Sequence, residues 1–268
     1  MKKLINLLVV FIHTSLIAQI NDSVSIKCMY NLTVVSDTNN PIFKNKDVKI
    51  LEIGKNSSKY YSYLRNKGDS AMKADVESGA NIAEILANKY KYHTDKSSLI
   101  VYHNYPTSLI SVTEDIGQMY LYTEELKTQK WKIEADTQTF IGLNCTKAIS
   151  NFRGRNYIAW FTYTIPTTFG PWKFNGLPGL ILKIYDEQNH YTFECTSIED
   201  GKMKPINKYA LMECIKITRK EMRKLIEERF VDPLGSFIGN SNGVNVSFND
   251  PNLDIPKRPF NPIERTYD

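Results

Sequence analysis

Short apolar or alternating segments follow one another at close spacing through most of the chain. Alternation of apolar and polar side chains is the pattern of a β-strand with one covered face. Tyr157–Ile165 is apolar on one face and partly apolar on the other, which predicts a central strand covered on both sides. Leu180–Tyr185 and Tyr191–Ile198 flank a polar turn and predict a hairpin. The other predicted strands are Val24–Val35, Val48–Ile53, Lys59–Leu64, Leu99–Asn104, Leu109–Thr113, Gln118–Thr123, Trp131–Ile133 and Thr139–Ser150.

Helical spacing occurs in two places. Apolar residues at 82, 85, 86 and 90 predict a short helix through residues 80–90. A clearer helix is predicted at Arg219–Phe230, where Thr218 and Glu221 have the spacing of a capping box. We expect its apolar stripe to pack on a sheet, with a partner-binding helix as the alternative. The stripe consists of Met222, Leu225, Ile226 and Phe230.

These elements predict an α+β fold built mainly from antiparallel strands, as a curved sheet or half-barrel with one or two short covering helices. No linker and no internal repeat divides residues 19–239, so we expect one β-rich domain there. Residues 240–268 are rich in Gly, Asn and Pro, which predicts an irregular C-terminal tail.

The first 18 residues have the pattern of a secretory signal peptide. Two lysines precede an almost unbroken apolar run, and Ala18 provides the small residue expected before a cleavage site. The alternative, a membrane anchor, requires an apolar stretch of about 20 residues, which this run does not reach. We therefore expect a mature chain that begins near Gln19, has no transmembrane segment and is periplasmic or secreted.

Composition narrows the function classes. Aromatic residues make up 12% of the chain and the net charge is +5, values of a folded protein without the basic stripe of a nucleic-acid-binding surface. Walker and G-x-G-x-x-G loops, a G-x-S-x-G elbow and an H-E-x-x-H pair are absent from the sequence. We expect no nucleic-acid partner, no cofactor and no metal site.

The four cysteines, Cys28, Cys145, Cys195 and Cys214, follow the predicted signal peptide. Export would allow one or two disulfides of unknown pairing, and buried free thiols are the alternative. Cys145 lies close to Lys147 and two arginines, which could activate its thiol. A metal site of Cys145, His190 and Cys195 is a weaker hypothesis than an activated thiol. His190 and Cys195 are predicted on opposite faces of one strand, which argues against a shared ion.

The loop Phe169–Leu182 holds bulky side chains between two predicted strands. Pro178-Gly179 suits the centre of a type II turn, with a positive φ at Gly179. Trp172 and Phe174 would then form the lip of a ligand pocket, or a structural plug at the end of the sheet.

A second turn is predicted between the strands Thr139–Ser150 and Tyr157–Ile165. Gly154 would take the positive φ of a hairpin turn, and Arg153 and Arg155 lie on either side of it. The two guanidinium groups at one tip could both bind an anionic head group or an acidic partner surface. The alternative is that one arginine pairs with a nearby acid and the other is solvated.

The segment Gly176, Leu177, Pro178, Gly179, Leu180 and Ile181 resembles the signature of the GLPGLI family. The resemblance is best over residues 131–198, including Phe152–Arg155 and Ala159–Thr162, and it returns at Asn261–Glu264. It implies an exported Bacteroidetes protein of unassigned function and supplies no catalytic residues. The strand-rich body also looks like the half-barrel of lipoprotein carriers of the LolA type.

Two functions follow as hypotheses. The first is a non-enzymatic cell-envelope protein that binds an apolar, lipid-like ligand, or an outer-membrane or periplasmic protein partner. Its candidate binding residues are Arg153, Arg155, Trp160, Trp172 and Phe174. The alternative is an enzyme with an unrecognised site, either a hydrolase or a thiol-based catalyst.

Overall fold

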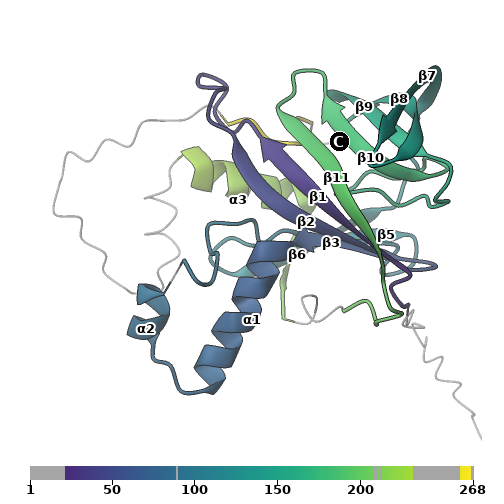
Figure 1. The fold of residues 1–268 in the computed structure, drawn as a ribbon. Helices are drawn as coiled ribbons and strands as arrows, with labels where there is room; N and C mark the ends of the chain where they lie inside the picture. Colours follow the sequence, from purple (N-terminus) through teal and green to yellow (C-terminus); the bar gives the residue numbers. More distant parts are fainter. Residues whose placement is uncertain (1–21, 89, 208–210, 212, 232–259, 267–268) are drawn as a thin grey trace, which may run out of the picture.

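The computed structural model describes residues 22–88, 90–207, 211, 213–231 and 260–266 (Figure 1). The predicted signal peptide, residues 1–18, lies outside the described residues. So do residues 240–259 and 267–268 of the predicted tail.

The described strands form one sheet of 12 strands in the order β12-β6-β5-β4-β3-β2-β1-β11-β10-β9-β8-β7. All neighbours pair antiparallel except β12 and β6, which are parallel. This confirms the predicted, mainly antiparallel α+β fold. The strands are β1 (Ile26–Val34), β2 (Asn45–Ile53), β3 (Ser58–Ser62), β4 (Ile100–His103), β5 (Leu109–Asp115), β6 (Met119–Glu125), β7 (Lys132–Phe140), β8 (Leu143–Phe152), β9 (Arg155–Thr162), β10 (Leu180–Asp186), β11 (Tyr191–Asp200) and β12 (Ile215–Lys216).

The sheet is curved but not closed into a barrel (Figure 1). Arg153, in the turn between β8 and β9, lies 2.7 Å from Glu124 of β6. These strands are near opposite ends of the strand order, so the ion pair shows that the two ends of the sheet approach each other. The curvature produces a concave face that α3 (Arg219–Val231) partly covers (Figure 1).

The predicted helix at Arg219–Phe230 is confirmed as α3. The backbone N–H of Glu221 donates to the Thr218 hydroxyl at 3.2 Å, and the N–H of Thr218 donates to the Glu221 carboxylate at 2.7 Å. The predicted capping box is therefore formed. α2 (Ile82–Ala87) lies within the predicted helix of residues 80–90.

The sequence did not predict α1 (Tyr63–Glu77), which begins directly after β3. The Ser62 side chain caps it by accepting from the backbone N–H of Arg65 at 3.2 Å. Gly68 lets the helix approach the carbonyl of Tyr92, since a Cβ at this glycine would be only 1.8 Å from that oxygen.

Two local predictions about strands and turns were wrong. Thr139–Ser150 is not one strand, because a turn at Ile141-Gly142 with positive φ at both residues separates β7 from β8. Gly179 has no positive φ either; in this loop that conformation belongs to Trp172, at 53°, and to Gly176, at 92°. Gly179 is required for another reason: a Cβ there would lie 2.0 Å from the carbonyl oxygen of Thr162.

The predicted hairpin turns are confirmed. Gly154 has φ of 79° between the paired residues Phe152 and Arg155, as the turn between β8 and β9 requires. β10 and β11 form the predicted hairpin. Among the described residues, the helices are too short or too polar to cross a lipid bilayer.

Candidate ligand-binding site

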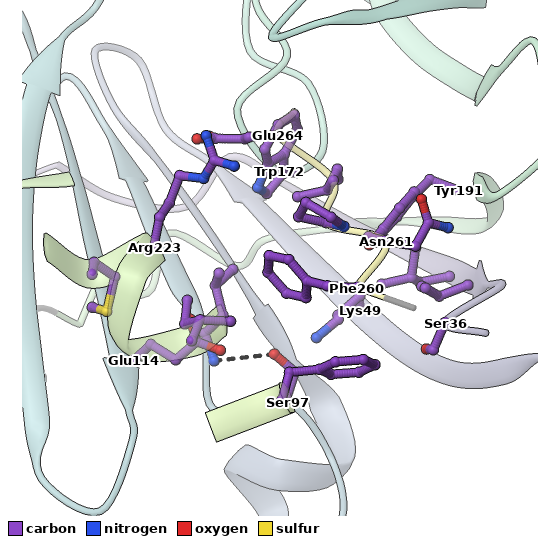
Figure 2. Close-up of a pocket in the computed structure, with 18 of the residues that line it drawn as sticks. Ser36, Lys49, Ser97, Glu114, Trp172, Tyr191, Arg223, Phe260, Asn261 and Glu264 are labelled. Carbon is purple, nitrogen blue, oxygen red and sulfur yellow. Dashed lines mark hydrogen bonds between the residues drawn. The ribbon is translucent and has the colours of Figure 1, made fainter. Parts of the chain in front are cut away.

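A cavity of about 320 Å³ lies between the concave face of the sheet, α3 and the C-terminal strap, which we define as residues 260–266 (Figure 2). We call this cavity the apolar chamber, because most of the side chains around it are hydrophobic. They include Leu32, Val34, Leu99, Tyr122, Trp172, Phe193, Met222, Ile226, Phe230, Phe260 and Ile263.

Strand alternation explains these walls. Leu32 and Val34 are two residues apart in β1, as are Tyr191 and Phe193 in β11, so each pair points to the same face. On α3, the predicted apolar stripe faces the chamber through Met222, Ile226 and Phe230. The Phe230 ring lies 5.4 Å from that of Phe260, which joins the helix to the strap.

A lysine is buried in the wall of the apolar chamber. The Lys49 side chain is 2% exposed, and its ammonium lies 2.8 Å from the Asp47 carboxylate. Burial lowers the pKa of Lys49, although Asp47 and Glu114 oppose that effect. The buried hydroxyl of Tyr60 also belongs to this wall and has no hydrogen-bond partner in the part of the chain that the structure describes.

Glu114 of β5 is the second charged group of the chamber wall. Burial raises the pKa of its carboxyl to about 7, against the opposing influence of Lys49 and Arg229. Glu114 forms no hydrogen bond or ion pair with any residue that the structure describes, which distinguishes it from the other buried acids nearby.

The C-terminal strap is held by Arg155. This guanidinium is fully buried and lies 2.7 Å from the equally buried Asp186. It also donates to the Asn261 side chain at 2.6 Å and to the carbonyls of Pro262 and Ile263. Arg155 therefore links β9 and β10 to the strap.

A second buried cation holds the other end of the strap. The Lys173 ammonium lies 2.5 Å from Glu264 and 2.7 Å from Glu124, and it donates to the Tyr122 hydroxyl at 2.8 Å. Burial disfavours the charge on Lys173, but these acidic partners outweigh it and hold the pKa of Lys173 above its ordinary value. Arg219 of α3 also contacts Glu264, at 2.6 Å, so the strap is tied to the helix.

The five predicted binding residues do not converge on one site. Trp172 lines the apolar chamber, whereas Phe174 is fully buried beside it, with the two ring centres 5.1 Å apart. Arg153 and Arg155 form the internal ion pairs with Glu124 and Asp186 described above. Trp160 packs on Phe140, at 5.9 Å between ring centres, outside the chamber wall. A binding role for these residues stays a prediction.

The cysteines are free thiols in this structure, with Cys28, Cys145 and Cys195 buried and Cys214 partly exposed. Burial raises the pKa of Cys145 to about 11, which is opposite to the activation that a catalytic thiol needs. Among the described residues, no three His, Cys, Asp or Glu side chains are arranged to hold a metal ion.

Ser58 and His103 form a contact that resembles part of a hydrolase site. The Ser58 hydroxyl lies 2.9 Å from Nδ1 of His103. Both residues are fully buried, and burial lowers the pKa of His103 to about 4. A substrate could not reach this hydroxyl without opening the core, so we assign the pair a packing role.

Sequence reasoning missed Lys49, Glu114 and the strap as parts of a site. A signal was present for the first two, because Lys49 shares a strand face with Leu51 and Ile53, and Glu114 shares one with Ile110 and Val112. The role of the strap could not be found in this way, since it contacts residues more than 100 positions earlier in the chain.

Comparisons with known proteins support the fold and leave the function open. A family model described as a protein of unknown function (Porph_ging) matches residues 113–183, less than half of the chain. No curated protein matches the sequence. Two crystal structures of PNGF-II are similar in fold: in the P21 form the TM-score is 0.50 at 14% identity, covering 77% of this chain and 34% of PNGF-II. In the C2 form the TM-score is 0.47 at 13% identity, covering 76% of this chain and 32% of PNGF-II. The chain thus spans about a third of the length of PNGF-II.

Proposed function

We propose that this protein is an exported, non-enzymatic cell-envelope protein that binds an apolar ligand in the apolar chamber. The observation that carries the proposal is the chamber itself, about 320 Å³ with mainly hydrophobic walls and a few polar groups. Ligand sites in proteins are typically concave, mostly apolar and of about 300–1,000 Å³. The curved sheet provides the rigid wall, and α3 and the C-terminal strap cover it.

Two features of the sequence support the cell-envelope part of the proposal. The first 18 residues have the pattern of a signal peptide, and the chain resembles the exported GLPGLI family around residues 176–181. We propose a periplasmic or secreted location on this basis. A protein partner at the envelope is a second way to occupy the same concave face.

The enzymatic alternative has less support. The buried thiol of Cys145 has a raised pKa, and the Ser58 hydroxyl is inaccessible. We therefore favour binding over a thiol-based or hydrolytic activity.

Trp172 provides a direct test, because its indole lines the chamber. Titration of the mature protein with a bromine-labelled single-chain fatty acid should quench part of the tryptophan fluorescence in a saturable way. The quenching should disappear in Trp172→Phe and persist in Trp160→Phe, since Trp160 lies outside the chamber wall.

A substitution that fills the apolar chamber should weaken ligand binding and serves as the negative control. Leu99→Trp places a larger side chain in the chamber wall and should weaken binding, whereas Ile215→Trp on the exposed strand β12 should leave it unchanged. Absence of saturable quenching in the wild-type protein would contradict the proposed function.

A further inference from the structure

A second cavity of different character lies next to the apolar chamber. This second cavity, the polar chamber, has a volume of about 960 Å³ and is bordered mostly by polar side chains, many of them from residues 45–47, 94–98 and 114–115. The two cavities share wall residues, so they are adjacent. The shared residues are Leu32, Val34, Ser36, Ser97 and Glu114.

Most charges around the polar chamber neutralise one another. Asp47 pairs with Lys49 at 2.8 Å, and Asp95 pairs with Lys96 at 2.8 Å. Asp115 lies 3.5 Å from Arg65, which also pairs with Asp69 at 2.7 Å. These acids and bases satisfy each other and leave little charge for a ligand to meet.

Glu114 and Arg229 are exceptions, as is Lys46 at the exposed rim. Glu114 lies where the two chambers meet, and Arg229, in the last turn of α3, borders the polar chamber. They influence each other electrostatically, but neither forms a hydrogen bond or an ion pair with a described residue. Their charged groups are therefore more than about 4 Å apart, which leaves room for a group between them.

We propose that the ligand is a single-chain amphiphile whose head group contains both an ammonium and an anionic phosphate or carboxylate. This inference rests on the proposed function. The hydrocarbon chain occupies the apolar chamber, the ammonium pairs with Glu114, and the anionic group pairs with Arg229. Lys46, exposed at the rim of the polar chamber, adds further positive charge on the anionic side.

Charge complementarity is the reason for this choice of head group. A purely anionic head would place its charge beside Glu114 and leave that carboxylate without a counter-ion. A purely cationic head would leave Arg229 unpaired. A head that contains both charges satisfies Glu114 and Arg229 together, and the small volume of the apolar chamber suits one chain better than two.

The test compares ligands with the same dodecanoyl chain, below their micelle concentration, by calorimetry. Lysophosphatidylethanolamine contains both charges, and lysophosphatidylglycerol contains only the phosphate. We expect the former to bind about tenfold more tightly, a difference of about 1.4 kcal/mol. O-dodecanoyl serine contains an ammonium and a carboxylate. It tests whether the site prefers the head group of a phospholipid or that of an amino acid.

Two variants assign the head-group contacts. Glu114→Gln should abolish the preference for the ethanolamine head while leaving lysophosphatidylglycerol binding the same or tighter. Arg229→Gln should weaken both phosphate heads by about fivefold or more. The matched controls are Glu125→Gln on β6 and Lys224→Gln on α3, whose side chains are 71% and 74% exposed and lie outside both chambers.

The outcomes separate this inference from the proposed function. Equal affinity for both lysophospholipids, or an unchanged preference in a folded Glu114→Gln protein, would overturn the head-group assignment. The proposal that the chamber binds an apolar ligand would still stand. Failure of every dodecanoyl ligand, together with the fatty-acid titration above, would overturn the proposed function itself.

Discussion

Two groups of charged residues lie around the concave face, and they differ in how many hydrogen-bond and ion-pair partners the protein gives them. The first group, which we call the strap anchor, consists of Arg155, Lys173 and the groups that they bind. Arg155 and Lys173 are each surrounded by several oxygen atoms at 2.5–3.2 Å. At the junction of the two chambers, Glu114 and Arg229 have no hydrogen-bond or ion-pair partner among the described residues.

The difference indicates separate roles. A buried charge is tolerated when its hydrogen bonds are complete, and such a network fixes the geometry of the chain around it. A carboxyl with a perturbed pKa and no protein partner, at the wall of a cavity, is a candidate for contact with a ligand. We infer that the strap anchor maintains the chamber and that the junction interacts with what enters it.

The largest loss of stability is expected from a substitution in the strap anchor. Arg155→Met leaves Asp186 buried without its cation and removes the hydrogen bonds to the strap, so the free energy of unfolding should fall by about 3–5 kcal/mol. Urea denaturation of the variant and the wild type measures this loss.

The double variant Arg155→Met/Asp186→Leu serves as the control. It removes both charges, so it should be less destabilised than Arg155→Met alone. If both proteins were equally unstable, the ion pair would not be the source of the loss.

A smaller effect, with a defined pH dependence, is expected at Glu264. Burial tends to raise its pKa, but Lys173 and Arg219 outweigh burial and hold the pKa below its ordinary value of 4.5. Glu264 therefore stabilises the fold above pH 4.5, and this contribution is lost as the pH falls through the lowered pKa. Glu264→Gln should cost about 1–3 kcal/mol at pH 7 and progressively less in acid. Urea titrations from neutral to acidic pH test this, and parallel curves for the two proteins would contradict it.

Glu114 should make stability depend on pH in the opposite direction to Glu264. Its pKa is raised from 4.5 to about 7, so the folded protein retains a proton that the unfolded chain has already lost. Stability therefore declines as the pH rises between these two values. Without ligand, Glu114→Gln should be more stable than the wild type by about 1–2 kcal/mol at pH 8 and equal to it at pH 4. Thermal melts at both pH values test this, with Glu125→Gln, which is exposed, expected to match the wild type at each.

The sequence predicted the strands well where side chains alternate, and it failed where local chemistry opposed the pattern. The start of α1 was assigned to a strand because Tyr60, Tyr61 and Tyr63 have high strand propensity. The Ser62 cap that begins the helix was not recognised in this tyrosine-rich segment. Ile141 also suggested strand continuity, although it takes φ of 43° in a turn and is 48% exposed.

The site was predicted only in part for a different physical reason. The α3 stripe and Trp172 follow from periodicity and loop composition. The chamber, however, exists because curvature brings β1, β5, α3 and the strap together, and strand patterns do not fix curvature. The unpaired state of Glu114 depends on that assembly and cannot be derived from residue order.

The smallest expected effect on stability is at Arg229, and it gives the sharpest form of the comparison. Arg229 is exposed in the last turn of α3 and has no ion-pair partner among the described residues. Its loss should therefore change the free energy of unfolding by no more than about 0.5 kcal/mol, the range typical of surface substitutions. Arg229→Gln and Lys224→Gln make the same charge change on one helix, so urea denaturation should give similar small values for both. If Arg229→Gln were as destabilising as Arg155→Met, Arg229 would belong with the strap anchor. The division between a satisfied anchor and an unsatisfied junction would then fail.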